Sequence, residues 1–479
     1  MRRFLTLLGT TLLLSAALCV GASASEYDAV AEDLSEIGMF RGTANGFELD
    51  RAPTRSEAAI MLVRLYGAEE EAAAAYEAGE ISHPFTDVGE TAAPYVAYLY
   101  TNGITNGTSA TTFGTGACTA QNYVVFLLRA LGYEDGTDFQ YADALTFAQE
   151  KGFYNPLMFP GTFLRDDLAA VTYQALGTDL KDGSTYLLKS LIDGGAVDAD
   201  AAAPMTQKIE AYRALMAASA KMDTSAAMDA DMDASIEMTY ANETSANMTM
   251  DMTGNVQMAV TEDDIQMAYV FDINAMGETM TMGEWMRDGW VYIQSETGGE
   301  TVQTKTQVNA EEMQALLEQV QSTASMASPA NSADGLAMLN SITTASNGGN
   351  TVYTLVISQN SISSVMNGLL SILNTDAAGA ESDMAFLEIL MDTMEFSDIT
   401  AIYTVGSNGQ LRDMKVQYTL TMDGDALGAP GESLEMAYDI DVTVNAVGDA
   451  VTVDFPANLD SFPEAPTEAS ADVDSTTAA

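Results

Sequence analysis

The chain has 479 residues, of which 69 are acidic and 18 are basic, with one histidine and two cysteines. A formal net charge of −51 excludes binding to nucleic acid or to anionic lipid surfaces, because no basic patch is available to displace phosphate counterions. A single histidine leaves zinc sites and serine–histidine catalysis without their usual side chains. The length indicates two or three domains, and we expect neither an enzyme nor a cofactor.

The first 24 residues have the pattern of a secretory signal peptide. A basic start at residues 1–3 precedes an apolar run at 4–20, and Ala22-Ser23-Ala24 predicts cleavage after Ala24. A membrane anchor is the alternative, but the run is short for a membrane span. Cleavage removes Cys19 and leaves Cys118 alone, so the mature chain has no internal disulfide. We therefore expect a secreted protein.

A helix start at Thr54-Arg55-Ser56-Glu57 is the sharpest local pattern in the chain. Thr54 and Glu57 have the spacing of a capping box, and they precede an apolar run. That run predicts a helix with Ala58, Met61, Leu62 and Leu65 on one face.

The same plan recurs twice, with turn glycines at Gly38, Gly103 and Gly152. The three copies cover about 28–72, 83–133 and 138–203. Each copy is too small to bury an apolar face alone, so we expect the three to pack around a shared axis.

The motif Thr54-Arg55-Ser56-Glu57, preceded by Gly38 and Phe47, resembles the S-layer homology repeat. The resemblance implies a helical prism of three repeats that binds an anionic, often pyruvylated, secondary cell-wall polysaccharide. It also implies that the motif arginine lies in a groove between repeats and pairs with acidic groups of the glycan. Carried over by position, the glycan-binding residues are Arg55 and Arg165. Thr54, Glu57, Gly38, Gly103 and Gly152 then support the motif.

The copies depart from that pattern in two places. The second copy has Thr119-Ala120-Gln121-Asn122, without arginine or glutamate, and the third replaces the glutamate by Asp167. An arginine fork suits a glycan carboxylate, because it donates two charge-assisted hydrogen bonds. The alternative is that Arg55 and Arg165 form salt bridges that close the repeat junctions. Glu57 is interpreted as a capping residue.

A second domain is predicted at 205–459, after a small, acidic linker at 196–204. A helix over 205–222 precedes strands in which apolar and polar residues alternate, at 228–240, 248–260, 265–273, 413–422 and 434–444. Hairpin turns are expected at 261–264 and 407–410. The alternation predicts one large antiparallel sheet with an acidic face and an apolar face.

Three helices are expected to cover the apolar face, at 310–322, 361–373 and 382–394. We further expect a loose connection at 328–350 and a disordered acidic tail at 460–479. The fold class is thus multidomain α+β, with an all-α repeat module and a curved sheet packed on helices. This curved sheet resembles the unclosed barrel of periplasmic lipoprotein carriers and mycobacterial glycolipid-carrying lipoproteins. It also resembles uncharacterised secreted domains of Gram-positive bacteria, with 284–292 as the best-matching hairpin.

Of the 29 methionines, 25 lie in this second domain. Flexible thioethers can line a surface for a lipid tail, but they can equally fill an ordinary core. Asp229, Asp231 and Asp233 alternate along a strand without a glycine turn, so they do not form a calcium loop. We predict a surface protein attached to wall polysaccharide. The alternatives are a carrier for a lipid or other apolar ligand, and a structural surface protein whose repeats bind no glycan.

Overall fold

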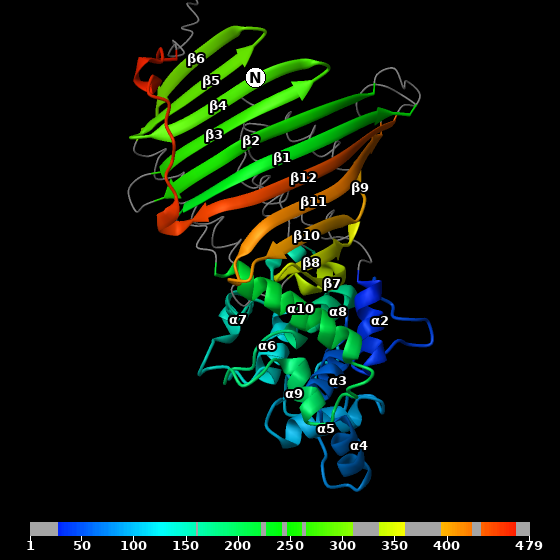
Figure 1. Ribbon diagram of the computed structural model, residues 1–479. Coiled ribbons are helices and arrows are strands. Elements are labelled where there is room, and N and C mark those ends of the chain that lie inside the picture. Colours follow the sequence, from blue (N-terminus) through cyan, green and yellow to red (C-terminus); the bar gives the residue numbers. More distant parts are fainter. Residues whose placement is uncertain are drawn as a thin grey trace, which may run out of the picture.

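The computed structural model describes residues 27–159, 161–221, 227–241, 247–260, 265–309, 335–359, 394–423 and 433–465. Its helices gather below one edge of a single sheet (Figure 1). This division agrees with the predicted α+β class. The predicted signal peptide, the turn at 261–264 and the helices at 310–322 and 361–373 lie outside the described residues. So does the helix at 382–394, except for Met394, which begins a strand.

The α-helices within the described residues are α2 (Asp28–Glu36), α3 (Arg55–Leu65), α4 (Glu69–Glu77), α5 (Ala93–Thr101), α6 (Ala120–Ala130), α7 (Ala144–Glu150), α8 (Arg165–Leu176), α9 (Leu187–Asp193) and α10 (Ala203–Ser219). We call α2 to α10 the helical module. Short 3₁₀ helices are η1 (Tyr141–Asp143), η2 (Pro156–Met158), η4 (Leu336–Met338), η5 (Gly448–Ala450) and η6 (Leu459–Ser461).

Three pairs of helices share one plan: α2 with α3, α5 with α6, and α7 with α8. The first helix of each pair ends at a glycine with positive φ: Gly38 at 72°, Gly103 at 72° and Gly152 at 74°. This backbone conformation strongly favours glycine. In two of the pairs a threonine precedes the second helix and caps it. The Thr54 side chain accepts the Glu57 N–H, and the Thr119 side chain accepts the Asn122 N–H. The sequence repeat is therefore also a repeat of local structure.

The strands are β1 (Ala227–Tyr240), β2 (Met248–Val260), β3 (Ile265–Ala275), β4 (Glu278–Arg287), β5 (Trp290–Thr297), β6 (Glu300–Gln307), β7 (Leu339–Asn347), β8 (Asn350–Ile357), β9 (Met394–Phe396), β10 (Ile399–Val405), β11 (Leu411–Asp423) and β12 (Ser433–Val447). Their order is β6-β5-β4-β3-β2-β1-β12-β11-β10-β8-β7, with β9 beside β11, and all pairings are antiparallel. The sheet is open, since β6 and β7 are opposite edges. The five predicted strands and the turn at 407–410 are confirmed.

The alternation separates the two faces of the sheet as predicted. Asp231 and Asp233 of β1 are exposed, whereas Ala230, which precedes Asp231, is buried. Asp233 lies opposite Asp441 of β12, so carboxylates from neighbouring strands share one face. Lys415 bridges Asp439 and Asp441 on the same face, which relieves part of their repulsion.

The acidic face also carries an apolar cluster, which the alternation did not predict. Residues 451–465, here called the C-terminal strap, run along the sheet from the end of β12 to β6 (Figure 1). Phe462 of the strap is 2% exposed and contacts Trp285 and Tyr292 edge-on. The strap ends beside β6, where the backbones of Lys305 and Glu464 form a parallel β-bridge. The ordered chain thus continues past 460, the predicted start of the tail; 466–479 lie outside the described residues.

The predicted loose connection at 328–350 is wrong for its second half. Residues 336–347 form η4 and then β7, which pairs with β8. The strand was missed because it is rich in Ser, Thr and Asn and alternates only weakly. Leu339 and Ile342 supply its buried side chains, and they are 5% and 8% exposed.

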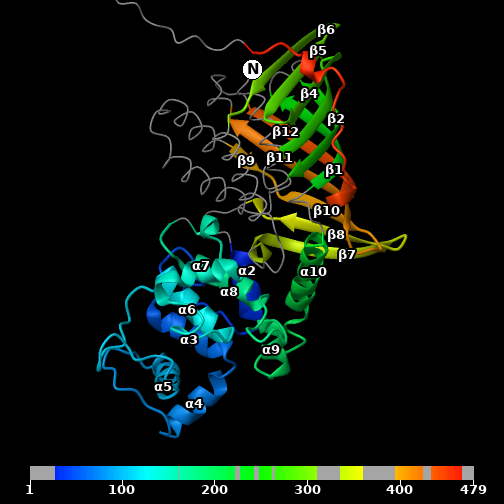
Figure 2. The same ribbon diagram turned by 90° about the vertical axis from the view of Figure 1, so that its left-hand side faces the viewer.

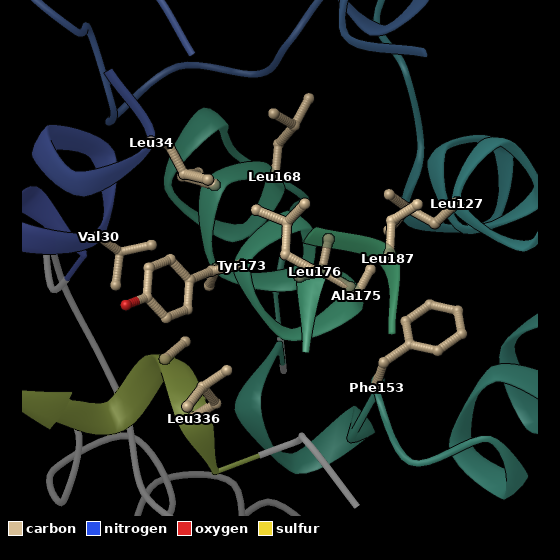
Figure 3. Close-up of a cluster of buried hydrophobic side chains, with 14 of the residues drawn as sticks. Val30, Leu34, Leu127, Phe153, Leu168, Tyr173, Ala175, Leu176, Leu187 and Leu336 are labelled. Atoms are coloured by element: carbon tan, nitrogen blue, oxygen red, sulfur yellow. The ribbon is translucent and has the colours of Figure 1, made fainter. Parts of the chain in front are cut away.

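The helical module packs against the β7 edge (Figure 2), with α8 contacting η4 and α10 contacting β7. Tyr173 of α8 lies between Val30 of α2 and Leu336 of η4 (Figure 3), and all three are almost fully buried. The predicted linker at 196–204 is partly packed into the core, since Val197 and Ala202 are buried, and its last two residues begin α10. Arg213 of α10 donates to the Gly177 carbonyl oxygen at 2.8 Å, so this helix is fixed to the module. One continuous core therefore joins the helices to the edge of the sheet.

Candidate site at the repeat junctions

The loops that precede α3, α6 and α8 meet at the centre of the helical module. The Arg55 N–H donates to the Gly116 carbonyl oxygen at 2.9 Å, which joins the first loop to the second. The Arg165 N–H donates to the Arg51 carbonyl oxygen at 2.9 Å, which joins the third loop to the first. The first loop thus forms two junctions, named here the Arg55 junction and the Arg165 junction.

Thr54 and Glu57 form the capping box that sequence analysis predicted. The Glu57 N–H donates to Thr54 Oγ1 at 3.2 Å, and the Thr54 N–H donates to Glu57 Oε2 at 2.7 Å. These bonds satisfy two backbone donors at the start of α3. Because the capped helix start fixes the backbone of Arg55, the residue after Thr54, it also fixes the direction of the Arg55 side chain.

At the Arg55 junction the guanidinium lies over an aromatic ring, and no described residue forms a hydrogen bond or ion pair with it. Its Cζ is 5.1 Å from the centre of the Phe113 ring. Nε is buried without a hydrogen-bond partner, and no ion pair of Arg55 occurs among the described residues. Asp87 holds the loop that carries the ring, because it accepts the Phe113 and Gly114 N–H groups, both at 2.8 Å. At this junction the Arg55 cation therefore rests on Phe113, and none of the described carboxylates pairs with it.

At the Arg165 junction each nitrogen of the corresponding guanidinium donates a hydrogen bond within the protein. Its Cζ lies 4.7 Å from the centre of the Phe40 ring, Nη1 donates to Glu57 Oε1 at 2.8 Å, and Nε donates to the Phe47 carbonyl oxygen at 2.8 Å. The Arg165 side chain is only 4% exposed. This is the salt bridge that sequence analysis named as the alternative role. The second copy has Ala120 at this position, as its sequence indicates.

The pKa values of the two acidic residues at the third position of α3 and α8 are shifted in opposite directions. Burial alone would raise the pKa of Glu57, but hydrogen bonds from Arg51 and Thr54 and the charge of Arg165 lower it to about 2. Burial raises the pKa of Asp167 to about 7, helped by the neighbouring charge of Asp166 and opposed by a hydrogen bond from the Leu164 N–H. Burial also lowers the pKa of Arg165, although Glu57 opposes this.

Sequence analysis missed Arg51 and the two aromatic supports. Arg51 Nη2 donates to Glu57 Oε1 at 2.6 Å, so two arginines share one carboxylate. Phe40 lies two residues after Gly38 and Phe113 lies ten residues after Gly103, so the two rings do not share a position in the repeat. Their pairing with arginines far along the chain has no local sign in the sequence.

Within the described part of the chain, no group of three or more His, Cys, Asp or Glu residues has the geometry of a metal site. None of the described helices has the length and hydropathy of a membrane span.

Two family models match the chain. The model described as "Family of unknown function (DUF6612)" matches residues 209–458, and the S-layer homology domain model matches residues 84–117. No curated protein matches. The S-layer homology match covers the first part of the second copy, up to the residues before α6, and includes Phe113 and Gly116 of the Arg55 junction. It indicates a cell-surface protein that is anchored through cell-wall glycans.

Proposed function

The chain belongs to the family of unknown function DUF6612, and from this premise we propose that it is a surface protein whose sheet is held on the cell wall by the Arg55 junction. The ligand is an acidic sugar of the wall polysaccharide, such as one that carries a pyruvate ketal. In this proposal the three helix pairs form the helical prism of the S-layer homology family, and this prism presents the curved sheet at the cell surface.

The observation that carries the proposal is the unpaired guanidinium of Arg55. Its stacking on Phe113 holds the cation in place, and its Nε is buried without a partner. A glycan carboxylate would supply the missing acceptor through two charge-assisted hydrogen bonds. Since the chain is strongly acidic overall, a local cation is needed to bind an anionic polymer.

The test is co-sedimentation with purified native cell wall. Arg55→Ala removes the fork, and hydrogen bonds to charged groups contribute about 1.5–3 kcal/mol, so the affinity should fall roughly 10- to 100-fold. Arg412→Ala, on an exposed position of the sheet, makes the same change of charge and should pellet like the unaltered protein.

Mild acid hydrolysis of the wall removes ketal-linked pyruvate and should abolish pelleting of the unaltered protein. Full pelleting of the Arg55→Ala variant would contradict the proposal, as would full pelleting with the treated wall.

A second candidate is carriage of an apolar ligand with one polar group. On the methionine-rich face, Glu284 of β4 lies opposite Tyr269 of β3, and burial raises the pKa of both groups. An acid group amid methionines is suited to an amphiphile. Native mass spectrometry of the full chain, secreted and purified without detergent, should then show an added mass that solvent extracts. A bare mass that incubation with envelope lipids leaves unchanged would refute carriage.

A further inference from the structure

Four methionines lie directly opposite one another on four consecutive strands of the sheet, β1 to β4 (Figure 1). Met258 of β2 is paired with Met228 of β1 and with Met267 of β3, and Met267 is paired with Met286 of β4. Residues that are directly opposite in an antiparallel sheet point to the same face. Because Trp285, the neighbour of Met286, lies under the strap, these four residues are on the other, methionine-rich face. We call them the methionine row.

The surroundings of the methionine row are apolar. Its two ends are paired with valines, Met228 with Val447 of β12 and Met286 with Val291 of β5. Met286 is 3% exposed, and the other three methionines are half-buried. The row is therefore shielded from water at one end and remains accessible along the rest of its length.

The spacing of the row suits a shared ion. Adjacent strands are about 4.8 Å apart, and two sulfur ligands that each bind one ion at about 2.3 Å, the zinc–sulfur distance, lie at most about 4.6 Å apart. Methionine has three rotatable bonds, so neighbouring thioethers of the row can converge on one ion without a change in the backbone. Thioethers are soft ligands and select Cu(I) among the biological metal ions.

A carboxyl group accompanies the row on the same face. Glu284 is two residues before Met286 in β4 and is paired with Tyr269, which is two residues after Met267 in β3. Its place in the adjacent row is nearest the Met286 end. A carboxylate there offsets the single charge of a Cu(I) ion, which neutral thioethers leave uncompensated.

We propose that the methionine row is a binding site for one Cu(I) ion, with the thioethers of Met258, Met267 and Met286 as its ligands and Glu284 as the counter-charge. Met228 extends the row at the end farther from Glu284. This proposal is independent of wall attachment, because the row lies on the sheet and the Arg55 junction lies in the helical module.

The experiment titrates the full secreted protein with Cu(I), kept reduced by ascorbate, against the coloured Cu(I) chelator bicinchoninate. Every protein carries Cys118→Ala, because the free thiol is also a soft ligand. This parent should bind one Cu(I) tightly. Met258→Leu with Met286→Leu keeps the apolar volume but leaves Met267 without a thioether opposite it. Even changes outside the ligand set cost about 10- to 100-fold in metal affinity, so this row variant should bind at least about 100-fold more weakly.

The matched control is Met252→Leu with Met282→Leu, which removes one thioether from each of the same two strands. Met252 is paired with an alanine and an isoleucine, and Met282 with a phenylalanine and a serine, so neither has a methionine opposite it. The control should bind Cu(I) like the parent. Circular dichroism and a thermal melt check the fold. Should the row variant not fold, Met267→Leu replaces it, since it removes the central ligand alone.

A loss of Cu(I) affinity that is confined to the row variant supports the proposal. Three results overturn it: no tight binding by the parent, the same affinity in the row variant as in the parent, or an equal loss in the row variant and the control. Each of these would mean that the four methionines are apolar filler of the sheet face.

Discussion

Both junctions place an arginine at the start of a helix over a phenylalanine of another repeat, yet Arg165 is ion-paired and hydrogen-bonded, whereas the Arg55 guanidinium has no such partner among the described residues. Arg165 is 4% exposed, with an ion pair to Glu57 and a hydrogen bond to the Phe47 carbonyl oxygen. The Arg55 side chain stacks on Phe113 and has no ion pair or hydrogen bond to any residue that the structure describes. The difference comes from the neighbouring repeat: the first copy supplies Glu57, whereas the second has Asn122 at that position of its helix. A motif residue therefore acquires its role from the partner that the next repeat supplies.

The largest expected effect follows from removing the saturated arginine. Arg165→Ala should lower the free energy of unfolding by about 3–5 kcal/mol, because breaking a buried ion pair leaves uncompensated polar groups. Here the Phe47 carbonyl oxygen loses its donor and the Glu57 carboxylate loses one of its two arginines, while it keeps its hydrogen bond from Arg51 Nη2. Urea denaturation followed by circular dichroism measures this loss. A change below about 1 kcal/mol would mean that the ion pair is no stronger than an exposed one.

The next effect concerns the two carboxyl groups at the third position of their helices. The pKa of Asp167 is raised in the folded state, so its contribution is present below pH 3.8 and is lost as the pH rises through about 7. Because one pKa unit corresponds to about 1.4 kcal/mol and the shift from 3.8 to about 7 spans roughly three units, Asp167→Asn should stabilise the protein by up to about 4 kcal/mol at pH 8. Below pH 4 it should have little effect.

Glu57→Gln is the matched control with the opposite sign. The pKa of Glu57 is lowered, so its contribution is present above pH 4.5 and is lost as the pH falls towards 2. The variant should be less stable than the unaltered protein at pH 7, with a difference that shrinks below pH 4.5. Denaturation at a series of pH values measures both variants. Parallel pH profiles for the two would refute the assigned electrostatics.

Local signals predicted the frame of the junctions well. The capping box at Thr54 and Glu57 and the glycines with positive φ depend on residues a few positions apart, so their spacing in the sequence is sufficient. The pairing of Glu57 with Arg165 is different, because it depends on how the first and third repeats pack. Sequence analysis therefore left the salt bridge and the glycan contact as alternatives for both arginines.

The sheet shows the same limit. Strict alternation located β1, β2, β3, β11 and β12, since each alternates over many residues. β7 escaped because its burial comes from contact with the helical module rather than from its own pattern. The apolar cluster around Trp285 on the acidic face was also missed, because the strap that covers it arrives from the end of the chain.

The smallest effect completes the comparison. Arg55→Ala removes no ion pair or hydrogen bond among the described residues, and it leaves the backbone contact with Gly116 in place. It forfeits only the stacking on Phe113, and an exposed cation–π contact contributes about 0.5–1 kcal/mol. The free energy of unfolding should therefore fall by less than about 1 kcal/mol, in the same urea titration that shows a large loss for Arg165→Ala. A loss equal to that of Arg165→Ala would mean that Arg55 also has a structural partner, and weaker wall binding by the variant would then report damage to the fold.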